Sequence, residues 1–377
     1  MNTAEPADYA FIDNAKAIGI VLVVLGHARG MPDVFHDLVY SFHMPLFFAL
    51  SGYLISPTNL TLAPLAHLRR SLRTIGLPYL VFFAISYGYW LATRGHGARA
   101  AKFAGLSATD PLPGFMSGIG VDMIVNPVLW FFPCLFVVTL LYYLARRRFG
   151  AGVVLVASAA LAIGWVEGVV PQLPMRLPYG LDIGLAVLVF YAAGAWARTA
   201  GYPPQPDGGG KAAGIGARPD PHADGRPHGR AAMWATLIVS AAVTAALTAV
   251  NGKVDVNVLG FGIHGWPFVI SGLAGTLMTI TIGRLFTAGR ATRWLAANSL
   301  IIFPLHTLMF NAFSGAGKLL MHSTEALDLT VPGSLLFAAA ALLLSVPAAA
   351  ILRRLVPAMF SRHGRRLKPA APAVATR

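Results

Sequence analysis

Three ionisable side chains lie within the first long apolar stretch of the sequence, namely Asp13, Lys16 and His27. Eleven helical residues make close to three turns, so Lys16 and His27 would share one helix face about 16 Å apart. Asp13 lies one turn before Lys16, where its carboxylate can neutralise the ammonium group. Imidazole titrates near neutral pH and serves as a general base or as a nucleophile. The shared face makes His27, Lys16 and Asp13 catalytic candidates. The alternative is that Asp13 and Lys16 form a satisfied pair at the inner membrane boundary and that His27 meets lipid headgroups.

A second histidine, His43, lies in the segment FHMPLFFALSGY, which covers residues 42–53. We expect it at a depth in the molecule similar to that of His27 and count it among the catalytic candidates. A lone buried histidine is often structural, and Pro45 by itself would explain a local kink. Both interpretations of His43 stay open from the sequence.

Three further residues are candidates for binding a substrate: Trp130, Asp182 and His306. Asp182 begins an apolar stretch, where a carboxylate can still reach water. His306 lies inside a later stretch, and a structural role for it is as open as a functional one. Trp130 stands in the segment LWFFP, and tryptophan at the end of a membrane span is usually an interfacial residue.

A basic cluster of Arg69, Arg70 and Arg73 precedes the third apolar stretch. Guanidinium groups hold phosphates through paired hydrogen bonds. A cluster of three such groups could hold the phosphates of an anionic ligand. Ordinary membrane-flanking charge is the alternative interpretation for each arginine taken singly.

The elements that must position these residues are membrane helices. The chain has 377 residues, of which 56% are hydrophobic and 12% charged, whereas a soluble domain has about 25% charged residues. The mean hydropathy is +0.64. So few charges cannot cover the surface of a soluble protein of this length. The single cysteine, Cys134, excludes a scaffold of internal disulfides.

About ten apolar stretches are each long enough to cross the roughly 30 Å of a bilayer's hydrocarbon core. We therefore expect an all-α, polytopic helical bundle with about ten transmembrane helices. The expected spans are 11–29, 38–57, 74–93, 127–145, 150–168, 179–197, 231–250, 266–284, 295–313 and 334–352.

Lys and Arg set the expected orientation. With the N-terminus in the cytoplasm, 21 of the 29 basic residues fall in cytoplasmic connections or the tail, and seven fall outside. This excess predicts that both termini are cytoplasmic. The net charge of +14 is then explained by topology, and we expect no nucleic-acid partner. High Ala, Gly and Arg usage indicates a bacterial inner membrane protein.

The chain divides into a membrane domain, 1–352, and a basic tail, 353–377. A segment at 199–230 is rich in Gly, Pro and charge and is expected to be a flexible cytoplasmic loop. The tail is expected to be disordered against anionic lipid. Asp13 and Lys16 interrupt the first apolar stretch, which favours a retained span over a cleaved signal peptide.

Several common catalytic motifs are absent from the sequence. It has no Walker loop, no GxGxxG between a strand and a helix, no CxxC pair and no HExxH. ATP hydrolysis, dinucleotide chemistry and metalloprotease activity therefore lack their usual parts, and we expect no metal.

These residues resemble the integral-membrane acyltransferase 3 family, in particular its branch of fucose 4-O-acetylase-like and surface-carbohydrate O-acetyltransferases. Asp13 to Lys16 and the segment VVLGH ending at His27 resemble the family's motif of a basic residue, a ten-residue gap and His. Residues 42–53 resemble its second signature, FHMPLFFxxSGY. Weaker resemblance extends over 69–79, 129–136, 177–194, 250–275 and 298–306. The family usually has Arg where this chain has Lys16, and a lysine lacks the bidentate geometry of arginine.

The resemblance implies acyl transfer from cytoplasmic acetyl-CoA, or another acyl-CoA, to a hydroxyl of a carbohydrate. On this hypothesis CoA phosphates dock near the arginine cluster and the pantetheine arm passes Lys16. His27 then acts as general base or briefly carries the acyl group. Either His43, Asp182 or His306 would orient His27 or bind sugar. The expected partners are a polysaccharide, oligosaccharide or glycolipid acceptor and membrane lipid.

Two other classes stay open. A transporter or flippase of lipid-linked sugars would use the intramembrane polar residues to line a path, but the sequence lacks paired, Gly/Pro-broken helices in two matching halves. A structural or sensory membrane protein would not require polar residues gathered on one helix face. Dependence on acyl-CoA separates the enzyme from both.

Overall fold

The computed structural model describes residues 10–202, 227–320 and 329–360. Each of the ten expected spans falls on a long helix within these residues. The long helices are α1 (Ala10–Gly26), α2 (Asp33–Tyr53), α5 (Leu77–Thr93), α8 (Phe131–Arg146), α9 (Ala151–Gly164), α10 (Leu181–Thr199), α11 (Pro227–Asn251), α12 (Gly265–Leu285), α13 (Arg290–Leu320) and α14 (Val331–Leu355).

The all-α, polytopic membrane architecture is confirmed. Among the described residues, eight helices are long and apolar enough to cross a membrane. Helices α1 and α2 are not among these eight. The first has only 17 residues, and the first turns of the second carry Asp33, His36 and Asp37. Ten crossings and two cytoplasmic termini therefore stay predictions.

Short elements connect the long helices. They are α3 (Pro57–Leu60), α4 (Pro64–Ser71), the π-helical turn η2 (Leu72–Gly76), α6 (Gly97–Lys102), α7 (Pro111–Ser117), the 3₁₀ turns η3 (Gly120–Asp122) and η4 (Pro127–Trp130), the turns η5 to η7 (Trp165–Val169, Val170–Gln172 and Pro178–Gly180), and α15 (Pro357–Phe360).

Some boundaries differ from the expected ones. Helix α2 begins five residues earlier, and α13 extends beyond the expected span at both ends. Of the expected loop at 199–230, residues 203–226 lie outside the described part. In the expected tail, residues 353–355 end α14 and residues 357–360 form α15, while 361–377 lie outside the described part.

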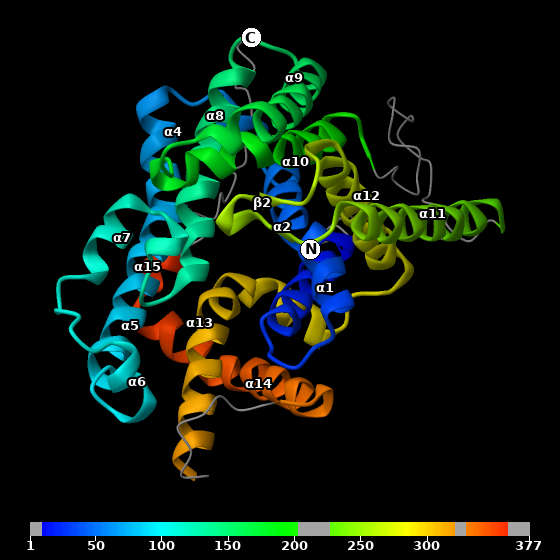
Figure 1. The fold of residues 1–377 in the computed structure, drawn as a ribbon. Helices are drawn as coiled ribbons and strands as arrows, with labels where there is room; N and C mark the ends of the chain where they lie inside the picture. The colour runs from blue at the N-terminus through cyan, green and yellow to red at the C-terminus, as the bar shows by residue number, and fades with distance from the viewer. Residues whose placement is uncertain (1–9, 203–226, 321–328, 361–377) are drawn as a thin grey trace, which may run out of the picture.

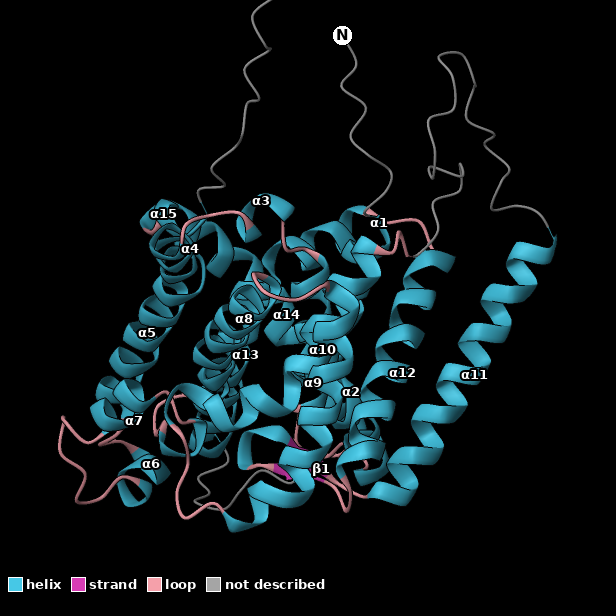
Figure 2. Cartoon of the chain, turned by 90° about the horizontal axis from the view of Figure 1, so that it is seen from above, coloured by secondary structure: helices cyan, strands magenta, loops and turns pink. Residues whose placement is uncertain are grey.

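Helix α1 lies at the centre of the packing that forms the site. It contacts α2, α12 and α13, and α2 in turn packs against α10 and α12. Helix α11 lies at the side of the bundle against α12 (Figure 1). In the view turned by 90° from Figure 1, α3, α4 and α15 lie at one edge of the bundle, and α6, α7 and β1 (Val254–Asp255) lie at the opposite edge (Figure 2).

Two glycines bring α2 and α10 into unusually close contact. A Cβ atom at Gly52 would collide with the carbonyl oxygen of Tyr191, and one at Gly194 would collide with the carbonyl oxygen of Ala49. Small residues let membrane helices approach until their backbones touch. The glycine of the SGY segment at 51–53 therefore has a packing role between these two helices.

A short hairpin covers the site at the edge opposite α4. Strand β1 pairs antiparallel with β2 (Gly260–Phe261), and the 3₁₀ turn η9 (Val256–Val258) connects them. The side chain of Asn251 fastens the base of the hairpin. Its Nδ2 donates to the Phe261 carbonyl at 2.8 Å, and its Oδ1 accepts from the His264 amide at 2.8 Å.

Candidate functional site

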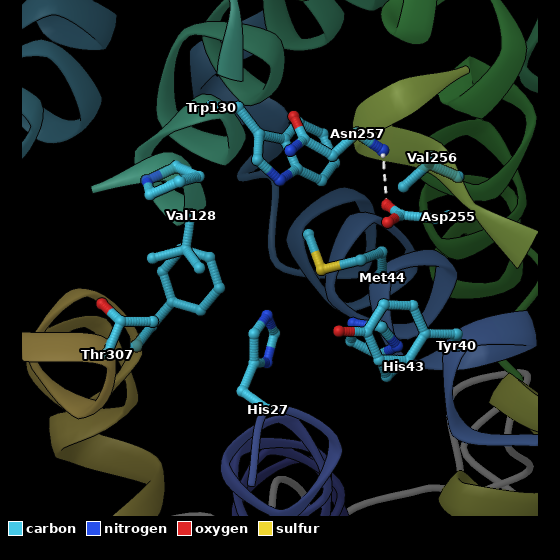
Figure 3. A pocket seen from close by; sticks show the side chains of 12 residues that line it. His27, Tyr40, His43, Met44, Val128, Trp130, Asp255, Val256, Asn257 and Thr307 are labelled. Carbon is cyan, nitrogen blue, oxygen red and sulfur yellow. Dashed lines mark hydrogen bonds between the residues drawn. The ribbon is translucent and has the colours of Figure 1, made fainter. Parts of the chain in front are cut away.

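A cavity of about 280 Å³ lies between the end of α1, α2, η4, α13 and the hairpin. We call it the histidine cavity. Figure 3 shows the His27 ring entering it from α1, opposite the hairpin residues. The polar and aromatic residues that line it include His27, Tyr40, His43, Trp130, Asp255, Asn257 and Thr307.

The hydrogen bond of His27 fixes which ring nitrogen is basic. His27 directly follows α1, and its amide still bonds the Val23 carbonyl at 3.1 Å, so the helical path continues. Its Nδ1 lies 2.9 Å from the same carbonyl oxygen. A carbonyl only accepts, so we assign the proton to Nδ1. The Nε2 atom then carries the lone pair that a general base or nucleophile requires.

His43 and His306 have the same arrangement. The Nδ1 of His43 donates to the Val39 carbonyl at 2.9 Å, and that of His306 to the Ile302 carbonyl at 3.3 Å. Both side chains are buried. The rings of His27 and His306 are 4.9 Å apart, edge to face. The structure thus brings His306 against His27 and places His43 in the lining of the same cavity as His27.

Tyr40 joins two of these histidines. Its ring centre lies 5.8 Å from that of His27 and 4.8 Å from that of His43. On its other side it stacks on His36 at 4.8 Å. Tyr40 thus gives the histidine cavity a second aromatic surface in addition to that of Trp130.

A buried asparagine positions the opposite wall of the cavity. Asn126 donates from Nδ2 to the Pro304 carbonyl at 2.9 Å and to Ser86 at 3.1 Å. Its Oδ1 accepts from the Thr307 hydroxyl at 2.9 Å. Pro304 has no N–H for the helical ladder of α13. The network therefore ties α5 and the segment before η4 to the part of α13 that carries His306.

Trp130 and Asp182 occupy different places. Trp130 is buried and lines the histidine cavity, as the substrate-binding hypothesis requires. Asp182 is fully buried outside it. Its carboxylate accepts from Arg176 Nε at 2.6 Å and from the amides of Leu177 and Ile183. It reaches the cavity only through Arg176, which also donates to the Asn257 carbonyl at 2.9 Å.

A second cavity of about 470 Å³ lies at the α4 end of the bundle. We call it the lysine cavity. Its polar lining residues include Lys16, Asn59, His67, Arg70, Thr74 and Tyr191. Of the predicted arginine cluster, Arg70 lines this cavity, whereas Arg69 and Arg73 do not. All three arginines are exposed.

His67 gives the lysine cavity a buried acceptor. Its ring stacks on Tyr143 at 3.9 Å, and its Nδ1 donates to the Asn59 carbonyl at 3.2 Å. Its Nε2 therefore carries a lone pair, and this buried atom has no hydrogen-bond partner within the described residues. A donor group of a ligand would satisfy it. Asp13 is half-buried on α1 and lines neither cavity.

The two cavities lie toward opposite edges of the bundle. The lysine cavity reaches α3 and α4, and the histidine cavity reaches β1 and η9. Helix α1 lines one cavity with Lys16, and its continuation lines the other with His27. Two ligands can therefore approach one helix face from two sides.

The comparison with known families decides what kind of protein has this arrangement. A family model described as an acyltransferase domain, that of acyltransferase 3, matches residues 9–354. The chain belongs to the acyltransferase 3 family. It is a membrane acyltransferase. No curated protein and no solved structure matches the chain.

Several residues of this acyltransferase's site were missed from the sequence. Tyr40, Asp255, Asn257 and Thr307 line the histidine cavity, and His67 lines the lysine cavity. His67 stands two residues before the predicted cluster, which was a usable signal. Asp255 and Asn257 lie in a loop between two spans, where only the fold brings them to the site.

Metal ligands are a separate question in this acyltransferase. Within the described residues, no group of three or more His, Cys, Asp or Glu side chains has a geometry that could hold a metal ion.

Proposed function

We propose that this acyltransferase moves an acetyl or other acyl group from cytoplasmic acyl-CoA to a hydroxyl of a cell-surface or secreted carbohydrate. The observation that carries the proposal is the placement of Lys16 and His27 in two different cavities along one helix. A donor that carries both phosphates and a long arm can bind at one cavity and present its thioester at the other.

The lysine cavity suits the donor. Lys16 and Arg70 offer positive charge to the phosphates of CoA. The unpartnered Nε2 of His67 offers an acceptor to an N–H or O–H of the same molecule. Arg69 lies on α4 and Arg73 on η2, and both add positive charge near the lysine cavity. The pantetheine arm then follows α1 over the roughly 16 Å from Lys16 to His27.

The histidine cavity suits the transfer. In the direct route, the acceptor oxygen attacks the thioester carbonyl while Nε2 of His27 takes the hydroxyl proton. The carbon–sulfur bond breaks, and the proton is returned to the departing CoA thiolate. In the two-step route, Nε2 attacks the thioester carbonyl, the carbon–sulfur bond breaks and CoA leaves as the thiolate. The hydroxyl oxygen then attacks the acyl carbon, the carbon–nitrogen bond breaks, and the hydroxyl proton passes through the freed Nε2 to the thiolate. His306, beside His27, and His43 stabilise the protonated imidazole through their lone pairs.

A carbohydrate acceptor is supported by the mixture of groups in this cavity. Trp130 and Tyr40 offer apolar ring faces, while Asp255, Asn257 and Thr307 offer polar atoms. Ligand sites combine a mostly apolar lining with a few polar groups that set orientation. The excess of Lys and Arg on the α4 side favours the cytoplasm for that side. We therefore place the acceptor outside a bacterial inner membrane.

The test uses purified protein in proteoliposomes with radiolabelled acetyl-CoA on the α4 side and extracted envelope glycans on the other. Wild type is expected to transfer label, and His27→Ala to lower the rate at least about a hundredfold. His96→Ala, at an exposed histidine in a connecting loop, is the control and is expected to match wild type. Retained activity in His27→Ala would refute the role of His27. Wild-type protein that releases no CoA with any glycan would favour transport instead.

A further inference from the structure

We infer that Asp255 selects the acceptor by accepting a hydrogen bond from a second hydroxyl, so that the histidine cavity favours a ring with neighbouring hydroxyls over an alcohol with one. The inference rests on the proposed function. It deepens that proposal by naming the chemical feature that makes a hydroxyl compound a substrate.

The fold fixes Asp255 at the cavity. It lies on β1, where its backbone is paired with Gly260 of β2. The turn that follows is held from outside the hairpin, because Arg176 donates to the Asn257 carbonyl at 2.9 Å. Figure 3 shows Asp255 and His27 entering the cavity from different sides. A carboxylate held in this way can discriminate between acceptors.

Most of the hydrogen-bonding capacity of Asp255 is unused. An ionised carboxylate has about four acceptor positions. Within the described residues, the side chain has one hydrogen bond, from the Asn257 amide to Oδ1 at 3.2 Å, and no ion pair. The carboxylate is half-buried, and burial raises its pKa. A half-buried carboxylate that makes no close ion pair gains most from hydroxyl or amide donors of a ligand.

The chemistry of the two groups defines the ligand. An ionised carboxylate and the Nε2 of His27 both only accept hydrogen bonds, so one molecule that satisfies both must carry two donors. Trp130 supplies a flat apolar surface on which a ring can lie. The cavity of about 280 Å³ admits a small unit. A ring bearing two neighbouring hydroxyls, free or at the end of a chain, meets these conditions.

The probes are cyclohexanol and the cis and trans isomers of 1,2-cyclohexanediol, which share one ring and differ in the second hydroxyl. With acetyl-CoA as donor, kcat/KM is measured from CoA release and ester formation. We expect the kcat/KM of wild type for one diol isomer to exceed that for cyclohexanol by about tenfold or more, as one charge-assisted hydrogen bond allows. Asp255→Asn is expected to reduce that preference about tenfold. Its amide oxygen can still accept from the Asn257 amide, so the hairpin keeps its turn.

Asp110→Asn is the matched control, since this half-buried carboxylate lies just before α7, at the same edge of the bundle. It is expected to keep the wild-type preference. Equal kcat/KM for cyclohexanol and both diols in wild type would overturn the inference. So would an equal loss for all three acceptors in Asp255→Asn, which would indicate an effect on His27. Failure of the proposed function is distinct from either, because wild type would then release no CoA with any acceptor.

Discussion

Lys16 and His27 lie eleven residues apart along one helical path, and each lines a different cavity of the bundle. Because α1 packs against α2, α12 and α13, this path is enclosed on several sides. On the proposed function, the pantetheine arm of the donor spans the distance between the two cavities while its phosphates stay near Arg70. The first three predictions test the two ends of this path and its support.

Arg70 should matter more for donor binding than its neighbours. We expect Arg70→Gln to raise the KM for acetyl-CoA about tenfold, because it removes a charge-assisted hydrogen bond to a phosphate. Arg69→Gln and Arg73→Gln remove the same charge from positions outside the lysine cavity and should raise it less than about threefold. Steady-state kinetics at fixed ionic strength compares the three. Equal effects would mean that the cavity does not distinguish them.

His306 should act as a positioning residue for His27. We expect His306→Leu to lower kcat about tenfold or more with little change in the KM for acetyl-CoA, since the ring lies at the far end from the phosphates. His306→Gln restores an acceptor near Nε2 and should recover part of the rate. Within the described residues, Nε2 of His306 is a buried acceptor without a hydrogen-bond partner. Replacing this acceptor by an apolar group should therefore change the free energy of folding little. A fall in Tm that parallels the fall in kcat would indicate a structural role instead.

Asp182 should support the fold rather than bind the acceptor. Removing one partner of a buried ion pair costs about 3–5 kcal/mol, because the other charge is left uncompensated. We therefore expect Asp182→Ala to lower Tm strongly, and the double variant with Arg176→Met to recover part of the loss. Thermal unfolding of purified protein measures both. A variant that is fully stable but has a raised KM for the acceptor would return Asp182 to the substrate-binding residues.

Asp255 should make the stability of the protein depend on pH. Burial raises its pKa, so the folded protein binds this proton more tightly than the unfolded chain. The folded state then loses stability as pH rises from about 4, the ordinary value, through the raised pKa. Asp255→Asn removes this titration. We expect its Tm to match wild type near pH 4 and to exceed it at neutral pH.

Asp110 gives this experiment a control of opposite sign. Hydrogen bonds from the Ser107 side chain and amide lower the pKa of Asp110. Its stabilising effect is therefore present at neutral pH and is lost as pH falls through that lowered pKa. Relative to wild type, Asp110→Asn should not gain stability between pH 4 and neutral pH. The same gain in both variants would show that Asp255 is not the source.

The sequence predicted the helices and the central histidines because both leave local signals. An apolar run long enough to cross a bilayer marks each helix, and the spacing from Lys16 to His27 follows from helical geometry alone. Trp130 lines the histidine cavity, and His306 lies against the His27 ring without lining the cavity itself. What brings them there is the contact of α13 with α1 and the network around Asn126.

The remaining site residues depend on contacts distant in sequence. Asp255 reaches the cavity because Asn251 and Arg176 hold a hairpin whose strands have two residues each. Asp182 does not contact the cavity for a similar reason, because its carboxylate forms an ion pair with Arg176. No periodicity or spacing in one chain encodes such partners.

The close contact of α2 with α10 through Gly52 and Gly194 has a mechanical consequence. With carbonyl oxygens of each helix against the glycines of the other, neither helix can turn about its axis or slide along its partner without a backbone collision. Tyr40 and His43 both lie on α2, so the wall of the histidine cavity that they form is rigid.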